Sequence, residues 1–130
     1  ITQKPLSGFV TQADRASEEY LIAALEKLFP GAAFYAEESG KSENQSDYCW
    51  VIDPLDGTTN FARQIPYWCI SVALTHKDFP ILGAIFNPIL NEFFYGEQSK
   101  GAWCNGVLIG VSDPQDFKDA LVAVGVPYVT

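Results

Sequence analysis

Two aspartates that flank a proline and a leucine form the segment of this sequence best suited to chemistry. Asp53 and Asp56 enclose Pro54 and Leu55, and Gly57 follows at once. Proline keeps the residue before it extended, and its fixed φ favours a turn, so the chain can bring the second carboxylate back beside the first. The Leu55 carbonyl can point the same way. These hard oxygen ligands favour Mg²⁺ over Zn²⁺.

A polar segment, Thr58-Thr59-Asn60, comes directly after this turn. If it opens a short helix, its backbone N–H groups offer an anion pocket beside the metal ligands. Cation ligands on one side of a turn and phosphate donors on the other are the arrangement of a phosphatase. The alternative is a tight Asp-Gly turn between two strands, with solvated acids. An EF-hand is excluded because the alternating ligands of that loop are missing.

The composition is that of a globular, acidic chain. Of the 130 residues, 48% are hydrophobic and 18% are charged, which is typical of one folded domain and excludes a disordered segment. The formal net charge of −8 disfavours direct binding to nucleic acid or to an anionic membrane, and it attracts divalent cations. No window approaches the roughly 18 apolar residues of a membrane span, and no signal peptide is recognisable.

The less common residue types, cysteine, histidine and methionine, indicate the cellular compartment and the completeness of the sequence. Cys49, Cys69 and Cys104 are odd in number and include no C-x-x-C pair, so we expect reduced, partly buried thiols in a cytoplasmic protein. The single histidine, His76, ends an apolar run and is interpreted as structural. Because the sequence begins at Ile1 and contains no methionine, we expect a piece of a longer protein.

A helix is predicted over 11–29, with Thr11 as its N-cap and Pro30-Gly31 as its stop. Charged residues of this segment, Glu18 among them, are expected to lie mostly off its apolar face. The apolar residues at helical spacing are Ala13, Ala16, Tyr20, Leu21, Ala24, Leu25 and Leu28.

Short strands follow the helix. A strand at 33–36 ends at Glu37, the segment 40–47 is predicted to be an exposed loop, and a strand at 50–53 runs into the aspartate turn. Turn signals, including Lys100-Gly101 and Asn105-Gly106, separate or follow further apolar runs that predict an antiparallel meander. The further strands are expected at 69–75, 81–87, 92–96 and, leading into Gly125, 121–124. This order predicts an α+β fold.

Three ordered motifs carry a resemblance to a known family. The segment Asp53-Pro-Leu-Asp-Gly-Thr-Thr-Asn-Phe61 resembles the long aspartate motif of the inositol monophosphatase family. Val10-Thr-Gln-Ala-Asp14 and Glu37-Glu-Ser39 precede it, and the 100–106 turn follows, in the order of that family. The resemblance implies a layered α/β sandwich, a mostly antiparallel sheet flanked by helices, in a homodimer. Residues 1–130 would be its N-terminal metal- and phosphate-binding part.

The resemblance also implies the metal ligands. Glu37, Asp53 and the Leu55 carbonyl would hold a first Mg²⁺, and Asp53 with Asp56 would share a second. Glu37 would also hold a weaker third ion through water. The implied activity is Mg²⁺-dependent, Li⁺-sensitive hydrolysis of a small phosphomonoester by metal-activated water. Bridging cations would also let a phosphate dianion approach a chain of charge −8.

The remaining implied roles concern water and phosphate. Asp14 and Thr58 would position or deprotonate the attacking water, and the amides of Gly57 and Thr58 would bind phosphate. Each residue also has a simpler interpretation. Asp14 lies three residues after Thr11 and can complete a capping box, and Thr58 can be only an N-cap. Glu37 follows a buried strand and must face out of the core, as a ligand or an ordinary exposed acid.

Several functions remain open at this stage. Inositol monophosphate is the first expected substrate, because Thr59-Asn60 resembles that branch and not the relatives that hydrolyse 3′-phosphoadenosine 5′-phosphate. A nucleotide, histidinol phosphate or fructose 1,6-bisphosphate phosphatase is the alternative, as is a non-catalytic regulatory binding protein that keeps the metal site. The family's later Trp-Asp metal ligand is absent from this sequence: Trp50, Trp68 and Trp103 are followed by other residues and are expected in the core or an interface.

Overall fold

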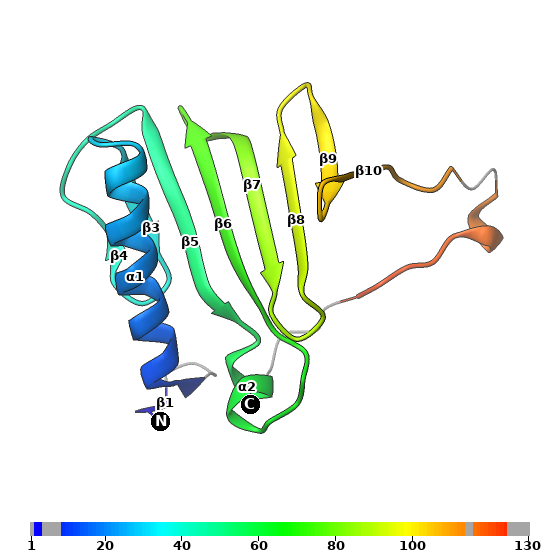
Figure 1. The fold of residues 1–130 in the computed structure, drawn as a ribbon, viewed down its shortest axis with the longest axis horizontal. Coiled ribbons are helices and arrows are strands. Elements are labelled where there is room, and N and C mark those ends of the chain that lie inside the picture. Colours follow the sequence, from blue (N-terminus) through cyan, green and yellow to red (C-terminus); the bar gives the residue numbers. More distant parts are fainter. Residues whose placement is uncertain (1, 4–8, 114–115, 125–130) are drawn as a thin grey trace.

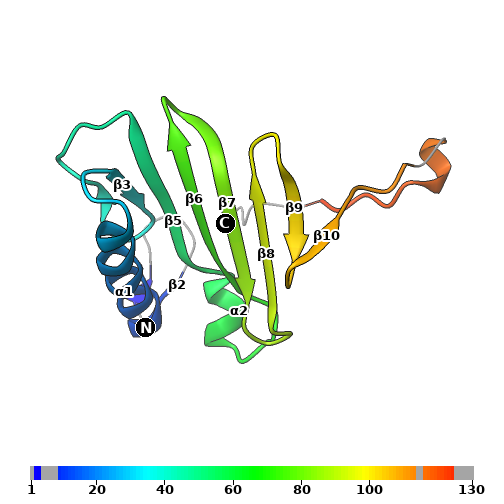
Figure 2. The same cartoon turned by 45° about the horizontal axis from the view of Figure 1, so that its top comes forward.

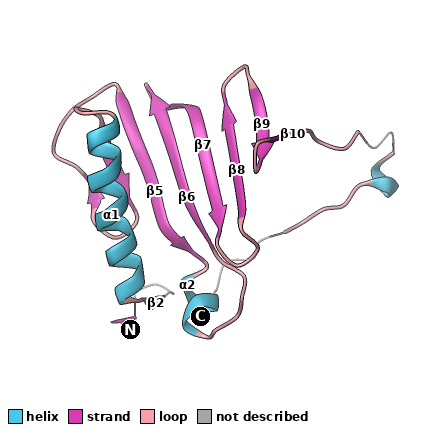
Figure 3. Cartoon of the chain, in the orientation of Figure 1, coloured by secondary structure: helices cyan, strands magenta, loops and turns pink. Residues whose placement is uncertain are grey.

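The computed structural model describes residues 2–3, 9–113 and 116–124, and strands dominate it (Figure 3). The helices are α1 (Gln12–Leu28), α2 (Thr58–Ala62) and a 3₁₀ helix, η1 (Phe117–Asp119). The strands are β1 (Thr2–Gln3), β2 (Phe9–Val10), β3 (Ala33–Ala36), β4 (Gly40–Lys41), β5 (Tyr48–Asp56), β6 (Cys69–His76), β7 (Phe79–Asn87), β8 (Glu92–Glu97), β9 (Gly101–Cys104) and β10 (Val107–Ile109).

Eight strands form one mixed sheet in the order β10-β9-β8-β7-β6-β5-β3-β4. Strands β3 and β5 run parallel, and the other neighbours described in this sheet are antiparallel. From β5 to β10, each strand lies beside its neighbour in sequence, as the fan of arrows in Figure 1 shows. The α+β class and the antiparallel meander are therefore confirmed. Strands β1 and β2 pair separately.

Helix α1 packs against β5 at one side of the sheet, while α2 lies beyond the end of β5 (Figures 1 and 2). The Thr11 side chain accepts a hydrogen bond from the Ala13 N–H, and Asp14 completes the capping box. The helix ends at Leu28, before Pro30, so its predicted start and stop are confirmed. In the described part of the chain, no helix has the length and apolar character needed to cross a membrane.

The inner face of α1 is polar in its first two turns and apolar in the next two. Asp14 is fully buried and Glu18 is 4% exposed. One to two turns later, Leu21, Ile22 and Leu25 pack on the hydrophobic core. One half of the helix therefore supplies hydrogen bonds to the interior, and the other half supplies apolar surface.

The predicted apolar face of this helix was therefore wrong in part. Tyr20 and Leu28 were expected inside, yet their exposed fractions are 75% and 74%, while Glu18 was expected outside and is buried. Hydrophobic periodicity assigns apolar residues to the inner face, but a polar side chain can take an inner position when hydrogen bonds replace its lost water contacts.

The core lies between α1 and strands β3, β5 and β6. Ala32, Ala36, Trp50 and Ile52 are each less than 5% exposed and contact one another. Trp50 is thus a core residue, as expected. Because the buried residues of β3 and β5 stand directly before the strand ends, the core gives those ends a rigid base.

Strand β5 is longer than predicted. It continues through Pro54 to Asp56, where a turn was expected, and a bulge interrupts its pairing with β6 between Asp53 and Asp56. A proline has no N–H to donate, and a bulge is one of the few places where a strand tolerates it. The two acids are therefore brought together by an irregular strand and not by a turn.

Other differences concern short strands. Strand β4 falls within the predicted loop at 40–47, where the Ser42 N–H donates to the Phe34 carbonyl at 2.8 Å. Strands β9 and β10 pair where only turns were predicted. The expected strand at 121–124 is absent from the structure, and its continuation into Gly125 lies outside the described residues. A strand forms only where another strand pairs with its backbone, and the residues of one segment do not reveal that partner.

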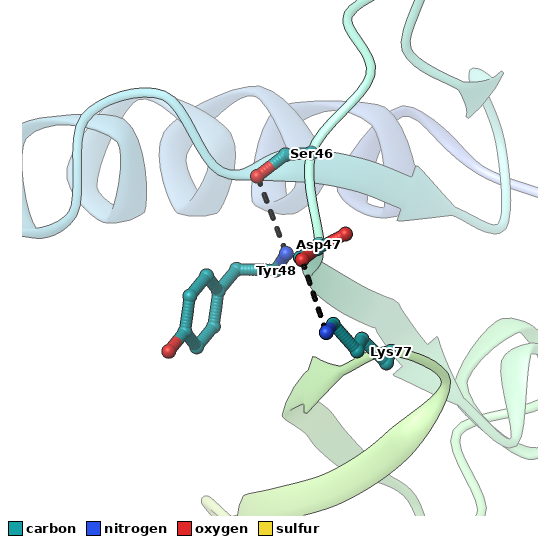
Figure 4. A network of polar contacts seen from close by, with 4 residues as sticks. All are labelled: Ser46, Asp47, Tyr48 and Lys77. Carbon is teal, nitrogen blue, oxygen red and sulfur yellow. Dashed lines mark hydrogen bonds and ion pairs between the residues drawn. The ribbon is translucent and has the colours of Figure 1, made fainter.

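A polar network fixes the start of β5 against the turn between β6 and β7 (Figure 4). The Tyr48 N–H donates to Ser46 Oγ at 3.2 Å, and Lys77 Nζ lies 3.7 Å from Asp47 Oδ2. The Lys77 N–H also donates to the Asp47 carbonyl at 2.7 Å. His76 stacks on Tyr48 with 4.5 Å between ring centroids, which supports its structural interpretation.

Candidate active site

Two predicted metal ligands meet where the parallel strands β3 and β5 run out of the core. Glu37 directly follows β3, and its N–H donates to the Ile52 carbonyl of β5 at 3.0 Å. Asp53 is the next residue of β5. The Glu37 side chain is exposed, and its carboxylate lies near enough to Asp53 for the two acids to share a proton. The carboxyl ends of parallel strands meet at one edge of a sheet. Glu37 and Asp53 are therefore close in space although they are far apart in the sequence.

The bulge in β5 decides where Asp56 points. Asp53 pairs with Ser71 and Asp56 pairs with Cys69, so three residue steps on β5 face two on β6. Ser71 and Cys69 are two residues apart and share a face of the sheet, and directly paired residues share a face as well. Asp53 and Asp56 therefore lie on the same face, whereas a regular strand would send residues i and i+3 to opposite faces.

The electrostatics of this edge suit a cation. Burial raises the pKa of Asp53 to about 7, aided by the hydrogen bond and negative charge of Glu37 and, less, by the charge of Asp56. The Leu55 N–H, which donates to Asp53 Oδ1 at 3.1 Å, opposes this change. Acids that repel one another in this way are stabilised by a shared proton or by a bound cation.

The donor set fits a hard divalent ion such as Mg²⁺, because it consists of carboxylate oxygens and a backbone carbonyl. It is an open edge and not a closed cage: among the described residues, no three His, Cys, Asp or Glu side chains surround a common point as metal ligands do. The structure therefore gathers Glu37 and Asp53 as a contacting pair, with Asp56 close enough to affect the charge of Asp53.

Asp14 and Thr58 form the second half of the site. Thr58 Oγ1 lies 2.9 Å from Asp14 Oδ1 and 3.0 Å from the Leu55 carbonyl, so its single proton has two acceptors. Asp14 Oδ2 accepts from the Thr11 N–H at 2.8 Å and from the Thr11 hydroxyl. The capping role of Asp14 and its contact with Thr58 are thus both present, one on each carboxylate oxygen.

The short helix that the sequence left open as one of two alternatives is present as α2, directly after Gly57. Gly57 is the N-cap, with φ +95°, and no side chain caps the helix. The interpretation of Thr58 as only an N-cap was therefore wrong, since Thr58 is the first helical residue. A Cβ on Gly57 would lie 3.1 Å from the Tyr67 carbonyl oxygen and 3.2 Å from Trp68 Cβ. Both the backbone angle and the space require glycine here.

Two residues of the site were missed from the sequence. Ser17 Oγ donates to the Pro54 carbonyl at 3.0 Å. Glu18 accepts from the backbone N–H groups of Glu38 and Ser39, one on each carboxylate oxygen and each at 2.9 Å. The available signal was spacing: Ser17 and Glu18 follow Asp14 by three and four residues, which places all three on one helix face.

A cavity of about 380 Å³ lies beside the site, with Asp56, Gly57, Trp68 and Cys69 in its lining. The Cys69 thiol is 3.7 Å from Asp56 Oδ2, and burial, with the charge of Asp56, raises its pKa. Trp68 packs edge-on against Phe61 of α2, with 5.1 Å between ring centroids. The three cysteines are free and partly buried, which confirms that part of the prediction.

Comparison with known proteins agrees with this geometry. The model of the inositol monophosphatase family matches residues 2–130. Inositol monophosphatase 3 of Solanum lycopersicum is 38% identical over 127 residues, which cover 95% of this chain and 47% of that protein. Nus factor SuhB of Pasteurella multocida is 38% identical over 128 residues, covering 98% of this chain and 48% of that protein.

Solved structures show the same fold. The inositol monophosphatase of Anabaena (Nostoc) sp. PCC 7120 superposes with a TM-score of 0.77 at 45% identity, over 81% of this chain and 42% of that one. This chain thus spans somewhat less than half the length of the relatives it matches. It belongs to the inositol monophosphatase family.

Proposed function

We propose that this member of the inositol monophosphatase family supplies the metal- and phosphate-binding part of a Mg²⁺-dependent phosphatase that hydrolyses a small phosphomonoester. The observation that carries the proposal is the contact between Glu37 and Asp53, with Asp56 on the same face of the sheet. Acids gathered at the end of a buried strand, where they repel one another, are a costly arrangement unless a cation is bound there.

Glu37, Asp53, Asp56 and the Leu55 carbonyl would hold Mg²⁺. The Leu55 oxygen already accepts from Thr58 at 3.0 Å, but a carbonyl has a second lone pair for a metal ion. When bound, the ion would lower the pKa of a coordinated water and offset negative charge on the phosphate. The chain's own contribution is to keep Asp53 and Asp56 on one face of the sheet and Glu37 beside Asp53.

Asp14 and Thr58 would orient the attacking water. When Thr58 Oγ1 donates its proton to Asp14 Oδ1, the lone pairs of Oγ1 are left to accept a hydrogen bond from water. Asp14 is fully buried and held by Thr11, and a carboxylate is a stronger acceptor than the Leu55 carbonyl, so donation to Asp14 is favoured. A water that donates to Thr58 is held in one orientation, and its proton can move along the same path.

Gly57 and Thr58 would bind phosphate through their amides. Both residues stand at the start of α2, where no earlier helical carbonyl is available to accept from the first N–H groups. The glycine at φ +95° turns the chain from β5 directly into this helix. The amides proposed to bind phosphate would thus come immediately after the proposed metal ligands in the sequence.

Inositol monophosphate is the substrate we propose first, in a Li⁺-sensitive enzyme that forms a homodimer. The support is the inositol monophosphatase relative and the Thr59-Asn60 pair. A regulatory binding role is a second candidate, since another relative is a Nus factor. The two candidates differ in one respect: only the first requires phosphate release from a phosphomonoester.

The test uses the full-length protein that contains this chain. After treatment with EDTA, phosphate release from inositol 1-phosphate, histidinol phosphate, fructose 1,6-bisphosphate and 3′-phosphoadenosine 5′-phosphate is measured as Mg²⁺ is added. We expect release to require Mg²⁺ and to be fastest with inositol 1-phosphate. Asp53→Asn should abolish this release, and Asp47→Asn is its matched control, because Asp47 is an exposed acid at the opposite end of β5 from Asp53. No release from any of these compounds would favour the regulatory role.

A further inference from the structure

Glu18 is a buried acid whose two oxygens are both committed to the backbone of another segment. It is 4% exposed, and its Oε2 and Oε1 accept from the N–H groups of Glu38 and Ser39 at 2.9 Å each. A carboxylate that accepts two adjacent backbone N–H groups forms short, charge-assisted hydrogen bonds with little rotational freedom. Such a pair fixes the path of the chain at those two residues.

The segment that Glu18 fixes begins directly after Glu37. On the other side, the Glu37 N–H donates to the Ile52 carbonyl at 3.0 Å. Glu37 therefore lies between two anchors, one on β5 and one on α1. Its own side chain is exposed and meets Asp53. Without the second anchor, the chain after β3 would be free to turn the Glu37 carboxylate away from Asp53.

We propose that Glu18 is a positioning residue that holds the Glu37 carboxylate beside Asp53 and so sets the strength with which this edge of the sheet binds a divalent cation. The inference rests on the proposed function, because it assigns a purpose to the alignment of these two acids. Glu18 itself does not touch substrate or metal ion; it acts through the backbone of Glu38 and Ser39.

The neighbouring contact shows that this helix face positions more than one segment. Ser17 donates to the Pro54 carbonyl, between Asp53 and Asp56. Residues 17 and 18 thus anchor the two strand ends whose acids must meet. Hydrogen-bonded partners that orient metal ligands typically change metal affinity by about 10–100-fold when they are removed.

The test compares Glu18→Gln with Glu19→Gln in the full-length protein. Glutamine keeps the size of glutamate but has a single acceptor oxygen, so it can satisfy one of the two N–H groups and opposes the other with its own N–H₂. Glu19 is the exposed neighbour on the same helix and controls for loss of one negative charge. Mg²⁺ affinity is measured by calorimetry, and folding by the melting temperature.

We expect Glu18→Gln to weaken Mg²⁺ binding by about tenfold or more, and Glu19→Gln by less than about twofold. Unchanged affinity in a folded Glu18→Gln protein would overturn the positioning role and leave the proposed function standing. Absence of Mg²⁺ binding to the unaltered protein would overturn both. A merely structural role would lower the melting temperature and leave the affinity of the folded protein unchanged.

Amide hydrogen exchange in the unaltered protein gives a second test if Glu18→Gln does not fold. The N–H groups of Glu38 and Ser39 should be protected to the same degree as that of Glu37, since all three donate to buried or strand acceptors. Exchange of the Glu38 and Ser39 amides at the rate of an open loop would contradict the anchor, and with it the proposal.

Discussion

The Asp14 carboxylate and the Thr58 hydroxyl meet at 2.9 Å although 44 residues separate them in the sequence. The bond joins the first turn of α1 to the first residue of α2. Since Asp14 is fully buried, its alignment is not disturbed by solvent, and its second oxygen is bound by Thr11. The relationship gives the Thr58 hydroxyl a defined direction, which a helix cap alone would not require.

Replacing Thr58 tests that direction. Thr58→Val keeps the shape of the side chain and removes the hydroxyl that we propose orients the attacking water. We expect kcat to fall on the order of 10²-fold, with small changes in KM and in Mg²⁺ affinity. Thr58→Ser retains the donor and is expected to keep most of the activity. The measurement is kcat of the two variants by steady-state kinetics. Equal kcat values in both would show that the Thr58 hydroxyl does not orient the water.

Removing the charge of Asp53 should abolish Mg²⁺-dependent phosphate release. Asp53→Asn takes away a carboxylate that contacts Glu37 and lies on the same face as Asp56. The fold should survive, because the metal-free protein already holds these acids in a repulsive arrangement that asparagine relieves. Phosphate release and calorimetric Mg²⁺ titration are the measurements, with Asp47→Asn as control; undiminished turnover in Asp53→Asn contradicts the metal assignment.

The raised pKa of Asp53 predicts how the stability of the metal-free protein depends on pH. In the unfolded chain an aspartate titrates at about 3.9, whereas burial and Glu37 raise the pKa of Asp53 to about 7 in the folded protein. Between these values the folded state binds more protons than the unfolded one, so this group's contribution to stability is lost as pH rises from about 4 to 7.

The measurement is the melting temperature in EDTA between about pH 5 and 8. Asp53→Asn should flatten the fall seen in the unaltered protein, and the difference between the two curves isolates Asp53 from the other acids. Added Mg²⁺ should reverse the trend, since the ion competes with the bound proton and is held more tightly as pH rises. Parallel curves for the two proteins would show that Asp53 titrates normally.

Gly57→Ala should destabilise the protein more than Gly31→Ala. Both glycines have positive φ, +95° and +86°, so each substitution meets a backbone penalty of about 1–2 kcal/mol. Only at Gly57 does the added Cβ also contact neighbouring atoms, at 3.1–3.3 Å; at Gly31 nothing lies within 4 Å. Urea unfolding gives the loss in free energy of unfolding for each variant, and the difference between the two losses is the cost of the steric contacts at Gly57. Equal losses would mean that Tyr67 and Trp68 move aside freely.

Much of the site was predictable because its motifs are short and continuous. Asp53, Asp56 and Gly57 lie within five residues, and their chemistry follows from residue type and spacing. Strands β6, β7 and β8 of the meander were predictable because each has its own apolar run between turn signals. These are local properties, and local sequence is sufficient to indicate them.

The parts that were not predictable depend on pairing between distant segments. The bulge in β5 exists because β6 pairs on both sides of Pro54, and no pattern within β5 reveals that. Likewise, Glu18 is buried because two amides that lie 20 and 21 residues away need acceptors. A hydrophobicity scale assigns a charged residue to the surface, because it takes no account of hydrogen bonds that the side chain accepts from a distant part of the backbone.

The polar half of α1 ties the alignment of the candidate site to one cooperative event. Asp14, Ser17 and Glu18 bond to three separate segments, so detachment of the helix from the sheet releases all three together. Local opening of such a block costs less than global unfolding. A transient species with β6 to β9 still paired and α1 undocked would keep most of its strand pairing yet have no aligned site. The fraction of molecules with an aligned candidate site therefore depends on the docking of α1 as well as on the folding of the sheet.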